Sequence, residues 1–266
     1  VTLANPAGIS WTLKKNENFK LDGLKLNVTI PTELVVAVDT LTATLGKYVK
    51  VYEVKAIPNV LDGRGTSSDP FKIESVDDMT KLASFIETSR MDYNGFYFKL
   101  MNNLDYTGKE YKQIATGNVR FQGNFDGNGK TISNLTFENS NSTTGQGIAM
   151  FGNVGETGYI HHLTVDGKFT AYNTAAAFVA HLYGKISDCV NLATVSTSNQ
   201  SYAAGFAGYA HDGAEISDCV NKGTVTTKTQ YAAGIVASAD NATVTSCVNE
   251  GTITATTGYV GGISAD

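Results

Sequence analysis

The chain has 266 residues, carries a net charge of −5 and contains only 17% charged residues. This length accommodates one large β-domain or two domains with their own cores, so neither a disulfide nor a metal is required for stability. The acidic balance, without a basic stripe, excludes nucleic acid as an expected partner. No apolar run is long enough to cross a bilayer, so no membrane span is expected in this chain.

Residues 1–60 predict a small antiparallel β-sandwich-like domain. Its expected strands are rich in alternating apolar and β-branched residues, and turn signals at Asp22-Gly23 and Gly46 separate them. The strands are expected at residues 9–13, 24–30, 34–38 and 48–54. Residues 56–65 would link this domain to a second one at 61–266, which divides into a capping helix with irregular first coils (61–146) and regular repeats (147–266).

One amphipathic helix is expected at about residues 76–89. Ser75 and Asp78 have the spacing of a capping box, and the apolar residues that follow fall on one helical face. A helix directly ahead of a stack of strands covers the open edge of the first coil, which would otherwise promote aggregation. We therefore predict that this helix caps the repeats.

The C-terminal half repeats with a period of about 28 residues. Tyr202, Tyr231 and Tyr259 each precede two small residues and a glycine, with offsets of 29 and 28 residues. A second motif, Cys-Val-Asn, recurs at Cys189, Cys219 and Cys247. Units of this length cannot bury their own apolar edges, so they must stack on one another. The pattern predicts an all-β fold, apart from the short helix, in the form of a right-handed parallel β-helix that begins before residue 150.

Stacking places equivalent residues in columns about 4.8 Å apart. One column of apolar side chains would be buried, comprising Phe178, Phe206, Ile235 and Ile263, and a second would contain Val195, Val225 and Ile253. The three cysteines fall in a column whose geometry does not suit a relaxed disulfide, so three buried free thiols are expected. The asparagines that follow them, Asn191, Asn221 and Asn249, predict a ladder of side-chain amides.

From residue 63 onward the chain resembles bacterial GLUG-motif proteins. The resemblance rests on residues 65–73 (Gly-Thr-Ser-Ser-Asp-Pro-Phe-Lys-Ile), 121–129 (Phe-Gln-Gly-Asn-Phe-Asp-Gly-Asn-Gly), 150–152 (Met-Phe-Gly) and the Cys-x-Asn-x-Gly-Thr repeats. It implies a right-handed β-helix in secreted or outer-surface bacterial proteins. Such proteins are adhesin-like, or form a non-catalytic region of IgA-cleaving metallopeptidases, whose His-Glu-x-x-His signature this sequence lacks. The repeats carry Ala-Gly-Phe-Ala-Gly in place of the usual Gly-Leu-Phe-Gly pattern.

An acidic column offers one candidate site. His162, Asp188 and Asp218 align across three successive units, and two stacked carboxylates beside a histidine are able to shift each other's pKa or hold calcium. The commoner interpretation of such a row is a set of solvated polar side chains. The Asp-Gly-Asn-Gly segment at 126–129 lacks the spaced acidic ligands of an EF-hand and is expected to be a structural turn with positive φ.

An aromatic column offers the second candidate site. Tyr202, Tyr231 and Tyr259 would form a strip on which a sugar stacks, although rings packed over the following turn are the simpler interpretation. The repeats also predict outward rows of hydroxyl side chains, one row at Thr194, Thr224 and Thr252 and the other at Ser196, Thr226 and Thr254. Such rows are typical of ice-binding solenoids, but also of ordinary solvent-facing strands.

Taken together, these patterns favour a non-catalytic cell-surface adhesion or recognition protein that binds a glycan or a host or matrix protein. The alternatives are a polysaccharide lyase or hydrolase on a β-helix, a structural spacer without a ligand and, least favoured, an ice-binding protein. No cofactor is expected, and calcium at the acidic column is the one alternative. The chain starts at Val1 without a signal-peptide pattern, which predicts a piece of a longer polypeptide, secreted or on the outer bacterial surface, with its leader removed or outside the chain.

Overall fold

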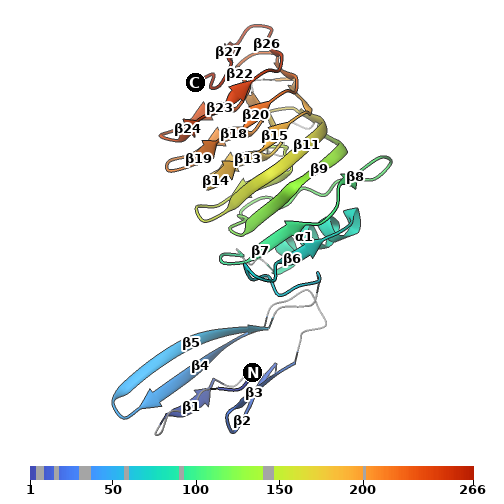
Figure 1. The fold of residues 1–266 in the computed structure, drawn as a ribbon. Coiled ribbons are helices and arrows are strands. Elements are labelled where there is room, and N and C mark those ends of the chain that lie inside the picture. Colours follow the sequence, from blue (N-terminus) through green and yellow to red (C-terminus); the bar gives the residue numbers. More distant parts are fainter. Residues whose placement is uncertain are drawn as a thin grey trace. The chain divides into compact units, whose positions relative to one another are not determined.

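The computed structural model describes residues 1–3, 9–14, 18–29, 37–56, 60–89, 93–139, 147–199 and 202–266. These residues form two compact units, Val1–Val60 and Leu61–Asp266 (Figure 1). The predicted linker at 56–65 spans the boundary between the units, and residues 57–59 of it lie outside the described residues.

The N-terminal unit consists of antiparallel sheets, as predicted. A three-stranded sheet has the order β1 (Ser10–Leu13), β4 (Ala37–Leu45), β5 (Tyr48–Ala56), and a hairpin joins β2 (Phe19–Asp22) to β3 (Lys25–Val28). Buried Phe19, Leu26 and Ala56 form the core of this unit. The strand expected at 34–38 begins, within the described residues, at Ala37 and continues to Leu45, and its residues 34–36 lie outside the described residues.

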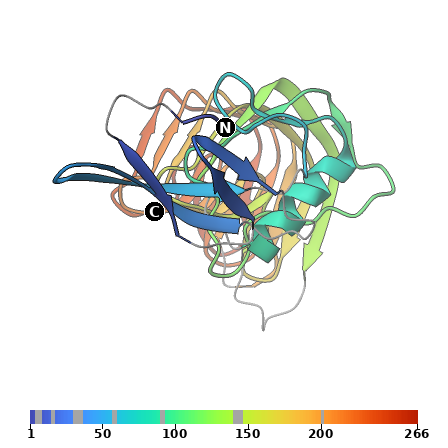
Figure 2. The same ribbon diagram turned by 90° about the horizontal axis from the view of Figure 1, so that it is seen from below.

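The predicted helix is α1 (Val76–Ser89). Ser75 and Asp78 cap it reciprocally: the Asp78 amide donates to Ser75 Oγ at 3.2 Å, and the Ser75 amide donates to Asp78 Oδ2 at 3.1 Å. Its buried face includes Phe85, whose ring lies 5.6 Å from that of Tyr93 in the first coil. Figure 2 shows α1 at the end of the coils. Among the described residues, no helix is long and apolar enough to span a bilayer.

The second unit is a parallel β-solenoid of about six turns. Its longest wall starts with β6 (Phe71–Ile73), β7 (Tyr97–Leu100) and β8 (Leu104–Asp105), so the solenoid begins well before residue 150, as predicted. The next two coils contribute the long strands β9 (Asn124–Asn139) and β11 (Tyr159–Ala171). In the later coils the same wall consists of short strands: β14 (Lys185–Ser187), β15 (Val190–Asn191), β16 (Thr194–Thr197), β19 (Glu215–Ser217), β20 (Val220–Asn221), β21 (Val225–Thr227), β24 (Thr243–Thr245), β25 (Val248–Asn249) and β26 (Ile253–Ala255).

Two four-stranded parallel sheets close the coils. One has the order β10 (Phe151–Val154), β13 (Val179–Leu182), β18 (Ala207–Ala210), β23 (Val236–Ala239). The other has the order β12 (Thr174–Ala176), β17 (Tyr202–Ala204), β22 (Tyr231–Ala233), β27 (Tyr259–Gly261). Each of the later coils, but not the first ones, therefore places one short strand in each of these two sheets.

The predicted columns lie inside the solenoid. Phe178 and Phe206 are fully buried and stack with ring centroids 4.7 Å apart. The asparagine ladder is present: Asn191 Nδ2 donates to Asn221 Oδ1 at 2.7 Å, and Asn221 Nδ2 donates to Asn249 Oδ1 at 2.7 Å. These amides continue an inward column that Ile132 and Val165 occupy in earlier coils.

The cysteines are free thiols, but the expectation that all three are buried is wrong for one of them. Cys189 and Cys219 are buried, whereas Cys247 is partly exposed. The coil that carries Cys247 has fewer neighbours within the described chain, so Ile253 and Ile263 in that coil are also only partly buried.

The Asp-Gly-Asn-Gly segment adopts the positive φ that the sequence predicts, with 52° at Asn128 and 68° at Gly129. It is a bend within one coil: the residues on both sides of it pair in parallel with β11. The same bend recurs in every later coil, where His162, Asp188, Asp218 and Ser246 have φ between 52° and 54°.

Candidate functional site

The three predicted tyrosines form a stacked column on one four-stranded sheet. Tyr202 pairs with Tyr231 and Tyr231 with Tyr259 in the strand register. Their ring centroids are 5.2 and 5.4 Å apart, with interplanar angles of 17° and 18°. Because Tyr231 has a tyrosine against each face, it presents an edge and a hydroxyl to solvent. Tyr259 is the most open member, with 68% of its surface exposed.

A second polar and aromatic column lies on the neighbouring sheet, where Asn153, His181, Tyr209 and Ser238 occupy equivalent positions. The ring of Tyr209 stacks on His181 at 5.0 Å and lies 4.3 Å from the ring of Tyr202. Tyr209 therefore joins the two columns into one surface. The side of Tyr209 toward the next coil faces the small Ser238.

The joined surface extends to the loops beyond β13 and β18. His181 lies 5.5 Å from His211, and His211 stacks on Tyr183 at 4.0 Å. The guanidinium of Arg120 sits 3.8 Å above the Tyr183 ring and also pairs with Glu156 at 2.6 Å. We call the resulting row of rings the aromatic strip; it comprises Tyr183, Tyr202, Tyr209, Tyr231, Tyr259, His181 and His211.

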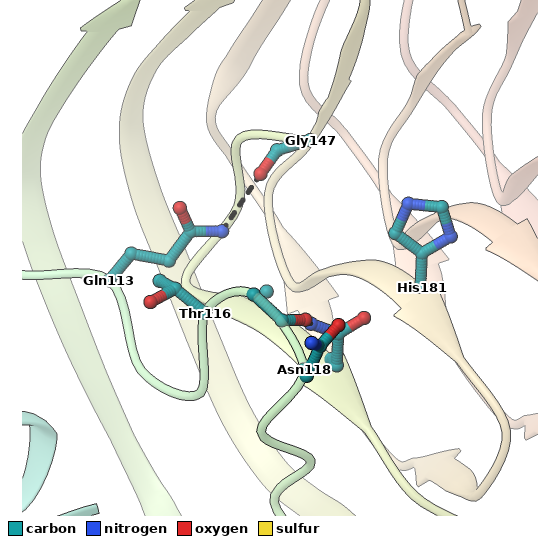
Figure 3. Close-up of a pocket in the computed structure, with 8 residues that line it drawn as sticks. Gln113, Thr116, Asn118, Gly147 and His181 are labelled. Carbon is teal, nitrogen blue, oxygen red and sulfur yellow. Dashed lines mark hydrogen bonds between the residues drawn. The ribbon is translucent and has the colours of Figure 1, made fainter. Parts of the chain in front are cut away.

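A polar pocket adjoins the strip at His181. The cavity has a volume of about 210 Å³, and its lining includes Gln113, Thr116, Asn118 and Asn153 (Figure 3). Asn153 Nδ2 donates to the carbonyl oxygens of residues 115 and 117 at 3.2 and 3.0 Å, which holds the loop in place. Gln113 Nε2 donates to the carbonyl of Gly147 at 2.9 Å, which joins a second segment to the wall.

Three titratable groups of the strip, His181, His211 and Tyr209, have pKa values shifted toward their neutral forms. Burial, together with the nearby His211, lowers the pKa of His181 to about 4. Burial also lowers the pKa of His211, with a further contribution from the positive charge of Arg120. Burial and a hydrogen bond to Tyr202 raise the pKa of Tyr209. At neutral pH these residues offer ring edges, hydroxyls and amides, which suits hydrogen bonding to a polar ligand.

The acidic column has a backbone explanation. His162, Asp188 and Asp218 all occupy the recurring bend with positive φ, a conformation in which Asn, Asp and His are several-fold enriched. All three side chains are exposed. Asp188 Oδ2 accepts a hydrogen bond from Ser187 Oγ at 2.6 Å. Among the described residues, Asp188 and Asp218 do not belong to a cluster of three or more ligand side chains.

The sequence interpretation found the three column tyrosines but not the rest of the strip. Asn153, His181 and Tyr209 are 28 residues apart, so the same period would have aligned them. Tyr183 and His211 are also 28 residues apart, each directly after a strand, so the same period aligns them, whereas Arg120 precedes the regular repeats. No periodic signal in the sequence identifies Arg120.

Comparisons with known proteins agree with this architecture. The chain is 28% identical over 128 residues to a candidate Gly-rich membrane protein of Evansella cellulosilytica. This alignment covers 46% of the present chain and 14% of its relative. It is also 27% identical over 158 residues to halomucin of Haloquadratum walsbyi, and that alignment covers 54% of the present chain and 2% of halomucin. The chain thus spans only a small part of these curated relatives.

A solved structure shares the fold. It is the crystal structure of a candidate immunoglobulin A1 protease from Bacteroides ovatus, with a TM-score of 0.59 and 20% identity. The similarity covers 77% of this chain and 64% of that one. Residues 199–226 match the profile of the GLUG motif. This motif and the parallel β-solenoid together fit a GLUG-motif β-helix protein.

Proposed function

We propose that this is a non-catalytic cell-surface recognition protein that binds an extended neutral glycan along the aromatic strip and its polar pocket. The observation that carries the proposal is the continuity of the strip. Ring contacts connect Tyr259, on the last described coil, to Tyr183 and His181 beside the pocket. A surface of this kind suits a chain ligand better than a compact one.

The chemistry of the strip favours a sugar. Tyrosine hydroxyls along the columns match the O–H groups of a pyranose, and the ring face of Tyr209 toward the small Ser238 suits its C–H groups. Such a contact is comparable to an aromatic pair, which contributes about 0.5–1.5 kcal/mol. The pocket adds amides from Gln113, Asn118 and Asn153, which are able both to donate and to accept hydrogen bonds. Because Arg120 is paired with Glu156, the surface offers an anionic ligand little net positive charge.

The comparisons support a surface location for this function. One relative is named as a Gly-rich membrane protein and the other as a halomucin, and both names fit a protein at the cell surface or outside the cell. The low charge of the chain and its many outward hydroxyl groups, such as Thr224 and Thr252, fit an extracellular protein.

The test is a glycan array followed by titration of the best hits, with two strip variants. Tyr209→Ala removes the ring that joins the two columns, and Asn118→Ala removes an exposed pocket amide. Each should weaken binding by roughly threefold to tenfold, at low and high salt alike. Tyr48→Ala is the matched control, because Tyr48 is 70% exposed in the N-terminal unit.

Binding that Tyr48→Ala weakens as much as Tyr209→Ala would contradict the proposed location. Binding that high salt abolishes would contradict the neutral ligand and point to an anionic one at Arg120. If no glycan on the array binds, a structural spacer without a ligand is favoured.

A further inference from the structure

A second cluster of polar side chains lies on the long wall. Asp126 of β9 and the consecutive residues His161 and His162 of β11 converge there. Asp126 Oδ1 is 3.7 Å from Nδ1 of each histidine, and the two Nδ1 atoms are 2.7 Å apart. Three potential metal ligands from two neighbouring coils thus face one another.

The backbone explains why two consecutive histidines point to one place. Successive residues of a regular strand face opposite sides of the sheet. His162 has a φ of 52°, and this left-handed bend turns its side chain to the same side as His161. The parallel register places Asp126 directly beside His161.

The surroundings of His161 select the tautomer that a metal requires. Its Nε2 is 3.0 Å from Asn124 Oδ1, an acceptor, so Nε2 carries the proton and Nδ1 a lone pair. The ring of Tyr159 stacks on His161 at 4.4 Å and fixes its plane. A ring nitrogen bonded to a fixed acceptor, with the other nitrogen free to ligate, is the usual arrangement of a metal-binding histidine.

We propose that Asp126, His161 and His162 bind a divalent first-row transition metal of the Zn²⁺ type. Ligand atoms around a tetrahedral zinc ion lie about 3.4 Å apart, given bonds of about 2.0–2.1 Å. The three distances of 2.7, 3.7 and 3.7 Å bracket that value, so small side-chain rotations bring the atoms into position. Two imidazoles and one carboxylate favour zinc, nickel or copper over calcium.

The site is open to solvent and carries one opposing charge. The side chains of His161, Asp126 and His162 are 13%, 24% and 55% exposed, so an ion can enter from outside and retain a water as its fourth ligand. Lys99 Nζ lies 3.3 Å from Asp126 Oδ2, the oxygen turned away from the histidines. This ammonium opposes a bound cation without competing for Oδ1.

The test is calorimetric titration of the whole chain with Zn²⁺. The wild type should bind one ion per chain at this site. Asp126→Asn keeps an acceptor for the Asn128 amide, and His162→Asn keeps a residue that tolerates positive φ. Because both variants preserve the bend, they should fold and yet lose the binding.

Two further variants separate this site from adventitious histidine binding. Asn124→Ala should weaken binding by about 10–100-fold, because Asn124 holds the tautomer of His161. Lys99→Gln should strengthen binding by roughly threefold to fivefold, because it removes a like charge. The control is His211→Asn, since His211 forms the other histidine pair of the solenoid, 3.2 Å from His181. It should leave binding unchanged.

The proposal is overturned if the wild type shows no saturable Zn²⁺ binding. It is equally overturned if binding survives both Asp126→Asn and His162→Asn, or if His211→Asn abolishes it.

Discussion

Removing the middle rung of the asparagine ladder, with Asn221→Ala, should destabilise the solenoid by about 3–4 kcal/mol. Asn221 is fully buried, accepts from Asn191 Nδ2 and donates to Asn249 Oδ1, each at 2.7 Å. Two such hydrogen bonds contribute about 1 kcal/mol each. The buried Nδ2 of Asn191 then keeps only the Ala193 carbonyl at 3.5 Å, and a poorly satisfied buried donor costs about 1–2 kcal/mol more.

Asn249→Ala is the matched control. Asn249 is partly exposed and makes one ladder bond, in which it is the acceptor, so its loss costs about 1 kcal/mol for that bond. Because the buried Asn221 Nδ2 then keeps only the Gly223 carbonyl at 3.3 Å, the total should be about 2 kcal/mol, smaller than for Asn221→Ala. Residue type and strand position are the same in the two variants, so the difference measures one additional ladder bond together with the deeper burial of Asn221.

The assay is urea unfolding followed by far-ultraviolet circular dichroism, which monitors the strands of the solenoid. The only tryptophan, Trp11, lies in the N-terminal unit, so its fluorescence reports separately on that unit. Asn221→Ala should lower the circular dichroism midpoint and leave the fluorescence transition in place. Equal destabilisation by Asn221→Ala and Asn249→Ala would refute the reasoning from burial.

Three other perturbations should have defined effects. Gly223→Ala should destabilise the solenoid by about 2–3 kcal/mol in the same urea assay, because the new methyl group overlaps the Ala193 carbonyl oxygen. Cys247 should react with a thiol reagent at pH 8 before Cys219 does, as mass spectrometry would show, because Cys219 is buried whereas Cys247 is partly exposed. Contacts with neighbouring thiols raise the pKa of both groups, so exposure decides the order. Stability should fall as the pH drops from about 6.5 to about 4, because burial lowers the pKa of His181 to about 4 and the unfolded chain takes up the proton first. Urea midpoints across that range, compared with His181→Gln, measure this contribution.

For each of these three predictions, one result would contradict the reasoning. Gly262→Ala, which introduces a methyl group with no heavy atom within 4 Å, should be neutral, and a loss equal to that of Gly223→Ala would contradict the steric argument. Faster labelling of Cys219 than of Cys247 would contradict the burial order. If the urea midpoint of His181→Gln depends on pH as that of the wild type does, His181 is not the cause of the loss of stability at low pH.

The period of the sequence was sufficient to predict the interior of the solenoid. Once Tyr202, Tyr231 and Tyr259 are aligned, the buried phenylalanines and the asparagine ladder follow, because stacking converts periodicity into contact. The capped helix was predictable for a local reason, the reciprocal spacing of Ser75 and Asp78.

The parts that the period could not predict lie where coils differ in length. Asp126 and His161 are 35 residues apart, and the register between β9 and β11 shifts at the bend and again between Val165 and Gly167. An alignment at 28 residues therefore places His162 with Asp188 and Asp218 and misses its neighbours Asp126 and His161. The polar pocket was missed for a similar reason, since Gln113 and Asn118 belong to a loop that occurs once.

The parallel register also determines how the solenoid responds to tension. Backbone hydrogen bonds between coils run along the solenoid axis, so a pull on its two ends loads one coil boundary at a time, as in opening a zipper. The ladder residues Asn221 and Asn249 are separated by 28 residues, and each coil released adds about 95 Å of extended chain in exchange for about 5 Å of stacked height. A protein built this way lengthens in steps and dissipates work at each step, so that a sudden load does not break it all at once.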